Sequence, residues 1–299
     1  MSIKNINTAS LNPNRVWLAK INDFVLLVKI RLSLVVVFSS LLGYVIAADG
    51  QGSFLQGIVL VVGGLLVTFA ANALNQVLEK DFDILMLRTS NRPVATGRMK
   101  SSEAVMFAGI CCLIGISMLA LFNPITALLG MISLIIYGFV YTPLKRYSTS
   151  ADAVGAIPGA LPVMIGFTAF EGTISLMAIS LFVVQFLWQF PHFWSIGFLG
   201  YDDYMKAGYK LLPKGINGID RNLGISSMFY ACLIIPLIVF LYIRLDVSLI
   251  STLIVCFFTL VYIYQSYIFH KKFDRSSALG LMFYSFFYLP IILFTYWLI

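Results

Sequence analysis

Long apolar runs separated by short polar stretches dominate the chain. Each run has about the 17 to 25 residues that an α-helix needs to cross a hydrocarbon core of roughly 30 Å. We count nine such runs and predict a transmembrane helix over each, at residues 32–48, 56–77, 104–122, 125–143, 153–170, 175–198, 225–243, 247–268 and 278–298. The pattern therefore predicts an all-α integral membrane protein.

The polar connections alternate in charge along the chain. Those after the second, fourth, sixth and eighth runs are basic, whereas the others carry almost no cations. With a cytoplasmic N-terminus, only Arg244 of the 20 Lys and Arg residues falls outside, as the positive-inside rule requires. The net charge of +7 follows from this asymmetry, because cytoplasmic loops face anionic headgroups, and we expect no nucleic-acid partner.

No long linker or low-complexity segment interrupts the chain. We therefore expect one transmembrane domain over residues 1–299, with residues 1–30 as a cytoplasmic N-terminal segment. The start of the chain has neither a signal-peptide layout nor a long leader rich in Arg and Ser, which favours a bacterial inner membrane. The four cysteines lie within predicted spans without metal-ligand spacing, so they are interpreted as small apolar residues.

A polar segment follows the second run directly. Its Asn72, Asn75, Glu79 and Asp83 are three or four residues apart, which places them on one face of a continuous helix, whereas Asp81 points elsewhere. Acidic groups at the end of a transmembrane helix are costly unless they are paired or bind a cation. Carboxylate and amide oxygens are ligands that suit Mg²⁺. The spacing therefore indicates a magnesium site.

Two arginines, Arg88 and Arg92, follow this face within the same loop. Guanidinium groups bind phosphate oxygens in a bidentate manner, so a diphosphate bridged by Mg²⁺ would suit the whole segment. The alternative is an ordinary charged loop whose carboxylates pair with nearby cations in headgroup water. The shared face of four oxygen-bearing side chains favours the binding site.

Two further loops on the same side carry polar groups. The sixth run ends in WQFPHFWSIGFLGYDDY, which places His192 near the membrane surface and Asp202 and Asp203 just beyond it. The segment YTPLKR supplies Lys145 at the end of the fourth run. We therefore expect three loops to contribute to one polar site.

Several short motifs carry a family resemblance that covers nearly the whole chain. Asn75, Glu79 and Asp83 are similar to an N-x-x-x-D-x-x-x-D motif, with Glu in the middle position. R-T-x-N-R-P at residues 88–93, W-Q-x-P-H-F at 188–193 and D-Y-x-x-x-G-Y at 203–209 also match. With these motifs the chain resembles the UbiA superfamily of intramembrane prenyltransferases, and within it the haem O synthase branch. The resemblance implies a nine-helix UbiA-type bundle.

The resemblance also implies a reaction. It would join the farnesyl group of farnesyl diphosphate to a vinyl group of haem b, giving haem O and diphosphate, with Mg²⁺ required and haem b as a substrate. The implied catalytic residues are Asn75, Glu79, Asp83 and Asp203, of which the first three would bind the metal. The implied substrate-binding residues are Asn72, Arg88, Arg92, Lys145, His192, Asp202 and Tyr204. Water must also add to the haem-side cation, and the motifs do not name the group that handles it.

The chain departs from the family pattern in its second acidic loop. Tyr201 stands where members commonly have a cation, and Asp202 and Asp203 are adjacent, whereas the family usually has spaced aspartates. Which of the two would hold a second Mg²⁺ stays open. For His192, contact with the haem iron or a propionate and a structural hydrogen bond are both open.

Two other functions remain as alternatives. Another UbiA-type enzyme acting on an aromatic acceptor would share the first acidic motif, but the W-Q-x-P-H-F segment argues against it. A membrane transporter would place ionisable residues near mid-membrane, whereas here the charges gather in loops at one face. The partners expected are farnesyl diphosphate, haem b and the lipid bilayer, with haem A synthase or a terminal oxidase assembly as recipients of the product.

Overall fold

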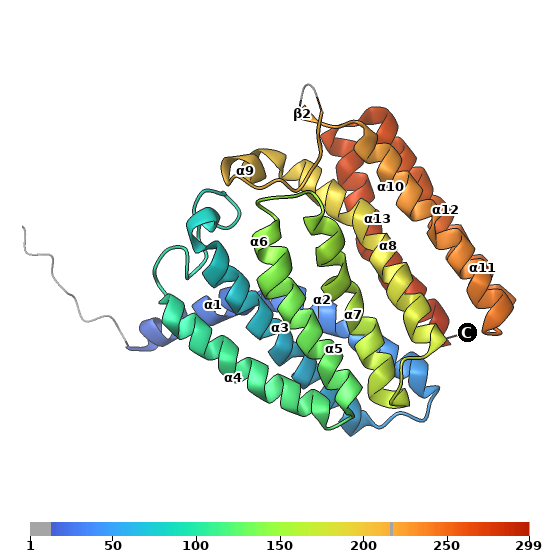
Figure 1. Cartoon of the computed structure of the whole chain (residues 1–299), viewed down its shortest axis with the longest axis horizontal. Coiled ribbons are helices and arrows are strands. Elements are labelled where there is room, and N and C mark those ends of the chain that lie inside the picture. The colour runs from blue at the N-terminus through green and yellow to red at the C-terminus, as the bar shows by residue number, and fades with distance from the viewer. Residues whose placement is uncertain (1–12, 216–217, 299) are drawn as a thin grey trace, which may run out of the picture.

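Helices form nearly all of the described chain, which in this computed structural model comprises residues 13–215 and 218–298 (Figure 1). The first twelve residues of the predicted N-terminal segment, including Lys4, lie outside the described part. The elements in order are α1 (Pro13–Val28), α2 (Ile30–Ala48), α3 (Phe54–Asp83), α4 (Ser101–Ala120), α5 (Pro124–Ile135), the π-helical turn η1 (Ile136–Tyr141), α6 (Thr142–Leu144), α7 (Ala151–Glu171), α8 (Leu176–Leu199), α9 (Tyr201–Lys206), β1 (Lys214–Gly215), β2 (Gly218–Ile219), α10 (Asn222–Cys232), α11 (Ile234–Arg244), α12 (Leu249–Lys272) and α13 (Arg275–Leu298).

Nine helical segments within residues 13–215 and 218–298 are long and apolar enough to cross a membrane, which confirms the predicted spans. Two of them are broken helices: α5, η1 and α6 together form one span, and α10 with α11 forms another. The largest shift of a boundary is at the end of α3, which continues to Asp83 although the apolar run ends near residue 77. A polar extension of the helix therefore projects from the second span.

Prolines explain both breaks. Pro143 lacks a backbone N–H and its ring crowds the carbonyl four residues earlier, so the preceding turn widens into η1. There the Thr142 N–H donates to the carbonyl of Tyr137, five residues back. In the same way, Pro236 near the start of α11 accompanies the interruption at Leu233.

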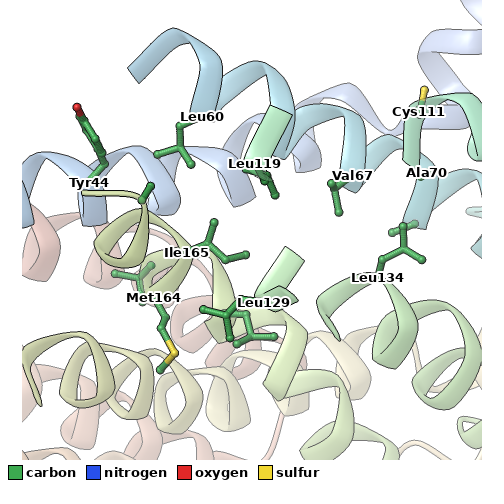
Figure 2. Close-up of a cluster of buried hydrophobic side chains, with 14 of the residues drawn as sticks. Tyr44, Leu60, Val67, Ala70, Cys111, Leu119, Leu129, Leu134, Met164 and Ile165 are labelled. Atoms are coloured by element: carbon green, nitrogen blue, oxygen red, sulfur yellow. The ribbon is translucent and has the colours of Figure 1, made fainter. Parts of the chain in front are cut away.

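Two apolar clusters hold the helices together. The first is built mainly from α2, α3, α4, α5 and α7, and Figure 2 shows part of it around Leu119, Leu129 and Ile165. The second joins α8 to α10, α11, α12 and α13. Trp188 and Tyr296 pack against both clusters, so the two halves share side chains.

Glycines allow α2 and α7 to pack closely in the first cluster. A Cβ atom at Gly43 would collide with the backbone of Val163, and one at Gly166 would collide with the backbone of Ser40. Small residues at such crossings let the backbones of membrane helices approach. The contact brings α7 into the middle of the molecule, between α5 on one side and α8 on the other.

The polar connections gather at one end of the bundle. In Figure 1 the α3–α4 connection, α6, α9 and the β1–β2 hairpin all lie at the upper end of the view. The three loops that the sequence analysis expected to act together therefore do lie on the same side.

Candidate active site

The end of α3 carries the first group of polar side chains. Asn72, Asn75, Glu79 and Asp83 are all buried, with exposed fractions of 2%, 1%, 3% and 0%. Asp81 is exposed and borders a hollow on the outer side of the helix. The predicted separation of the two faces is therefore confirmed.

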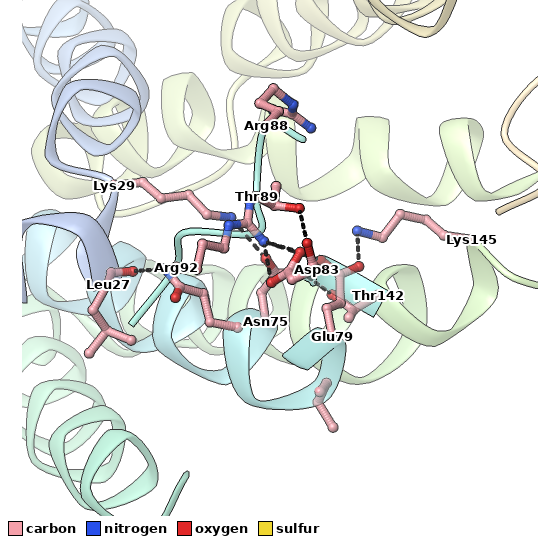
Figure 3. A network of polar contacts seen from close by, with 12 residues as sticks. Leu27, Lys29, Asn75, Glu79, Asp83, Arg88, Thr89, Arg92, Thr142 and Lys145 are labelled. Atoms are coloured by element: carbon pink, nitrogen blue, oxygen red, sulfur yellow. Dashed lines mark hydrogen bonds and ion pairs between the residues drawn. The ribbon is translucent and has the colours of Figure 1, made fainter. Parts of the chain in front are cut away.

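Cations surround the two buried carboxylates (Figure 3). One guanidinium nitrogen of Arg92 lies 2.7 Å from both carboxylate oxygens of Asp83 and 3.8 Å from Oε2 of Glu79. Lys145, at the end of α6, forms an ion pair with Oε1 of Glu79. The α3–α4 connection and α6 thus each supply a cation to α3.

A third cation, Lys29, reaches the same place from the junction of α1 and α2. Its Nζ donates to Oδ1 of Asn75 at 2.8 Å, and Nδ2 of Asn75 donates to Oγ1 of Thr142 at 3.1 Å. Burial, and then the charge of Arg92, lowers the pKa of Lys29 well below its usual value. The sequence does not single out Lys29 as a site residue, because it fits the set of cytoplasmic cations that determine orientation.

The backbone of Lys29 has a left-handed conformation, with φ 48°. This conformation costs a residue with a side chain about 1 kcal/mol or more, and such costs often mark functional sites. Asn72 supports the junction, because its Nδ2 donates to the carbonyl of Val28 and to Oγ of Ser33, both at 3.1 Å. The role of Asn72 in substrate binding stays a prediction.

The α3–α4 connection is folded tightly against the end of α3. Oγ1 of Thr89 donates to the backbone carbonyl of Asp83 at 2.8 Å, which turns the chain back toward Arg92. Arg88 points away from the ion pairs in Figure 3 and is exposed. Its Nη2 donates instead to the Tyr204 hydroxyl at 3.3 Å, which links this connection to α9.

The second acidic loop contributes mainly tyrosines. Asp202 is exposed, and Asp203 is half-buried with its carboxylate 3.6 Å from Lys206. Tyr209 is buried, and Nζ of Lys145 lies 5.5 Å from the centre of its ring. Burial, and then the nearby carboxylate of Glu79, raises the pKa of the Tyr209 hydroxyl, so it stays protonated and can donate. In the sequence, Tyr209 is distinguished only as the last residue of the D-Y-x-x-x-G-Y motif.

His192 occupies a different place. Its Nδ1 lies 2.7 Å from Oγ of Ser285 on α13, and its ring stacks on Trp188 and meets the edge of Phe286. Within the described residues, no hydrogen bond or ion pair joins it to the end of α3. The structure therefore separates His192 from the ion-paired group, and its predicted contact with haem stays a prediction.

The ion-paired group is suited to a polyanion. Lys29, Arg92 and Lys145 place three basic side chains against the two carboxylates of Glu79 and Asp83, and a bound polyanion would favour the charged form of Lys29. In the described part of the chain, no three His, Cys, Asp or Glu side chains lie close enough to hold a metal ion. Two carboxylates and the oxygen of Asn75 nevertheless fit Mg²⁺, which usually takes one or two protein carboxylates and completes its shell with water and phosphates.

Comparisons with known proteins agree with this architecture. The model of the UbiA prenyltransferase family matches residues 36–287. A protoheme IX farnesyltransferase of Christiangramia forsetii is 38% identical and covers 97% of this chain and 96% of its own length. The mitochondrial protoheme IX farnesyltransferase of Homo sapiens is 34% identical over 89% of this chain and 59% of its own length.

Solved structures show the same fold at low sequence identity. A digeranylgeranylglyceryl phosphate synthase superposes with a TM-score of 0.78 at 16% identity, covering 93% of this chain and 98% of that one. A UbiA homologue from Archaeoglobus fulgidus, bound to GPP and Mg²⁺, has a TM-score of 0.64 at 16% identity and covers 91% of this chain and 99% of its own. Because the family model covers most of the chain and these relatives match nearly all of it, the chain belongs to the UbiA prenyltransferase family.

Proposed function

We propose that this protein transfers the farnesyl group of farnesyl diphosphate to a vinyl group of haem b, giving haem O and diphosphate. The observation that carries the proposal is the buried group of three cations around Glu79 and Asp83, in a chain similar over 97% of its length to a protoheme IX farnesyltransferase. A UbiA enzyme with an aromatic acceptor is the second candidate, and the W-Q-x-P-H-F segment at residues 188–193 disfavours it.

The diphosphate of the substrate binds where the cations meet. Arg92 presents a planar guanidinium, and Lys29 and Lys145 present point charges from two other segments, so the phosphate oxygens are held from three sides. Asn75, Glu79 and Asp83 would hold Mg²⁺, which neutralises the charge that develops on the departing diphosphate. Since these groups are already held in place by ion pairs, little reorganisation is needed when the C–O bond breaks.

The farnesyl cation requires a region without water and with electron-rich walls. The rings of Tyr137 and Tyr141, both in η1, lie next to one another with centres 5.6 Å apart. Nζ of Lys145 lies 4.8 Å from the ring of Tyr141, which ties this pair to the diphosphate end. Aromatic faces attract cations, so the tyrosines stabilise positive charge on the allylic carbon after the diphosphate leaves.

We place the protein in a bacterial inner membrane as one transmembrane domain over residues 1–299, with the site loops on the cytoplasmic side. The distribution of Lys and Arg among the loops supports this orientation. The side chains shared by the two apolar clusters support one domain. Haem O would pass from there to haem A synthase or to a terminal oxidase assembly.

To test this proposal, the chain is expressed in bacterial membranes that lack their own haem O synthase. The haem is then extracted, separated by chromatography and identified by mass spectrometry. Wild type should yield haem O, and chelation of Mg²⁺ in isolated membranes should abolish its formation. Asp83→Asn should lose the product, because Asp83 is buried in the ion-paired group. Asp81→Asn is the matched control, because its carboxylate lies on the exposed side of the same helix turn.

Two other outcomes of this assay would distinguish the candidate functions. Consumption of farnesyl diphosphate without haem O would mean that the acceptor is not haem. No consumption by wild type at all would overturn the prenyltransferase assignment and favour a transporter.

A further inference from the structure

Asp152 differs from the other buried carboxylates of this chain. Four of the 13 Asp and Glu residues are buried, namely Asp23, Glu79, Asp83 and Asp152. The first three form ion pairs with Arg98, Lys145 and Arg92, respectively. Within residues 13–215 and 218–298, no cation lies within ion-pair distance of Asp152. A group so costly to bury points to a role beyond packing.

Local structure explains only part of its position. Asp152 is in the first turn of α7, where the helix dipole stabilises a carboxylate by about 0.3–1 kcal/mol. Nε1 of Trp194 on α8 donates to Oδ2 of Asp152 at 3.0 Å. No described donor reaches Oδ1. Because the burial of an ion costs several kcal/mol, the dipole and one hydrogen bond do not offset it.

Asp152 borders the proposed reaction site from the α7 side. Gly155, one turn further along α7, lies so close to the ring of Tyr141 that a Cβ atom there would be 2.6 Å from it. Tyr141 in turn lies under Lys145, which pairs with Glu79. A continuous series of contacts thus leads from the diphosphate end to the turn of α7 that carries Asp152.

Aromatic rings surround the side chain of Trp194, which contacts Asp152 from α8. Trp194 packs edge-on against Phe190 and Tyr230, whose own rings stack with centres 4.0 Å apart. His192 lies on the other side of α8, where it contacts Ser285 of α13. Asp152, whose Oδ1 has no described donor, therefore lies against this aromatic surface and one helical turn from the residue that touches Tyr141, whereas His192 is directed toward α13.

This inference rests on the proposed function, in which water adds to the haem after farnesyl transfer. We infer that Asp152 is the general base for that hydration. The C1–O bond of farnesyl diphosphate breaks and its electron pair leaves with diphosphate. The π pair of the vinyl group then forms the bond to C1 of the farnesyl group, which leaves a cation on the vinyl carbon attached to the porphyrin. A water oxygen bonds to that carbon, and Oδ1 of Asp152 takes the proton released by the water.

Other carboxylates are less suited to this step. Glu79 and Asp83 are held by Lys145 and Arg92 at the leaving-group end. The negative charge of Asp152 also stabilises the haem-side cation before water attacks, and the hydrogen bond from Trp194 keeps the carboxylate oriented. Asp152 thus favours hydration over loss of a proton from the cation, which would give an unhydrated alkene.

The test is the ratio of hydrated to unhydrated farnesyl haem, which differ in mass by one water, measured in the haem O assay. Asp152→Asn should lower this ratio about 100-fold or more while farnesyl diphosphate is still consumed, since a general base contributes about 10²–10⁴-fold. Asp152→Glu should keep part of the hydration, and Trp194→Phe should lower the ratio less than Asp152→Asn.

The ratio does not depend on how much protein folds, so a structural defect alone would leave it unchanged. An unchanged ratio in Asp152→Asn overturns the assignment of the base. If Asp152→Asn does not accumulate, an unchanged ratio in Asp152→Glu, whose carboxylate is displaced by one methylene, overturns it equally. Absence of any farnesyl haem from wild type is a separate result, which would reject the proposed function itself.

Discussion

A single guanidinium nitrogen of Arg92 is 2.7 Å from each of the two carboxylate oxygens of Asp83. The carboxylate is completely buried and the arginine side chain is 15% exposed. The pair therefore lies largely out of water, where an attraction is screened less than at a surface. It holds the α3–α4 connection against the end of α3.

Removal of Arg92 should destabilise the protein as well as impair catalysis. Arg92→Ala leaves Asp83 buried without its partner, which costs about 3–5 kcal/mol. Thermal unfolding in detergent should show a lower Tm, and Arg92→Lys should recover part of it. Lys20→Ala is the control, because Lys20 pairs with Glu103 and both side chains are partly exposed at the protein surface. An equal loss of Tm in both alanine variants would contradict this prediction.

Lys29 should contribute to binding of the diphosphate. Lys29→Met removes a buried cation that contacts Asn75, and a lost hydrogen bond to a charged group costs about 1.5–3 kcal/mol. The KM for farnesyl diphosphate should therefore rise roughly 10- to 150-fold in steady-state assays. Lys20→Met should leave KM near the wild-type value, because Lys20 pairs with Glu103 at the protein surface. If the two variants behave alike, Lys29 does not contact the substrate.

The contact between Gly155 and Tyr141 should tolerate no side chain. Gly155→Ala places a methyl group against the tyrosine ring, and overpacking of this kind typically costs about 1–3 kcal/mol. We expect lower kcat, since Tyr141 lies beside Lys145. Gly109→Ala on α4 is the control, since a Cβ atom there meets no other atom within 4 Å. Normal kcat in Gly155→Ala would show that Tyr141 moves without consequence.

The two adjacent aspartates of α9 should differ in importance. Asp203 is half-buried and precedes Tyr204, which accepts a hydrogen bond from Arg88, whereas Asp202 is exposed to solvent. Asp203→Asn should therefore lower kcat/KM by at least tenfold, which corresponds to about 1.4 kcal/mol. Asp202→Asn should change it by less than about threefold. If Asp202→Asn lowers kcat/KM more than Asp203→Asn does, Asp202 would be the functional aspartate of α9.

Much of this fold follows from hydrophobic patterning. Nine apolar runs predicted nine spans, and the spacing of Asn75, Glu79 and Asp83 predicted their common face, because both depend only on helix geometry. The family assignment rested on short motifs and is confirmed. Roles of individual residues in catalysis stay predictions.

Contacts that depend on tertiary packing were not predictable in the same way. Lys29 reaches the site only because a left-handed residue turns α1 away from α2, and no pattern in LLVKIRL signals that turn. Asp152 stands directly before the fifth apolar run, and the absence of a described cation beside it becomes visible only when the cations nearest to each buried acid are known. The apolar pattern identified a membrane boundary near residue 77, and the helix continued past it because ion pairs stabilise its polar end.

The 30-residue length of α3 has a consequence for substrate handling. At 1.5 Å per residue it spans about 45 Å, whereas the hydrocarbon core is roughly 30 Å thick. In the proposed reaction, the polar end of α3 would therefore hold the scissile C–O bond at the level of the lipid headgroups. The prenyl tail of the substrate can then remain among the acyl chains while its charged head exchanges with water on one side. The diphosphate product does not have to cross the hydrocarbon core.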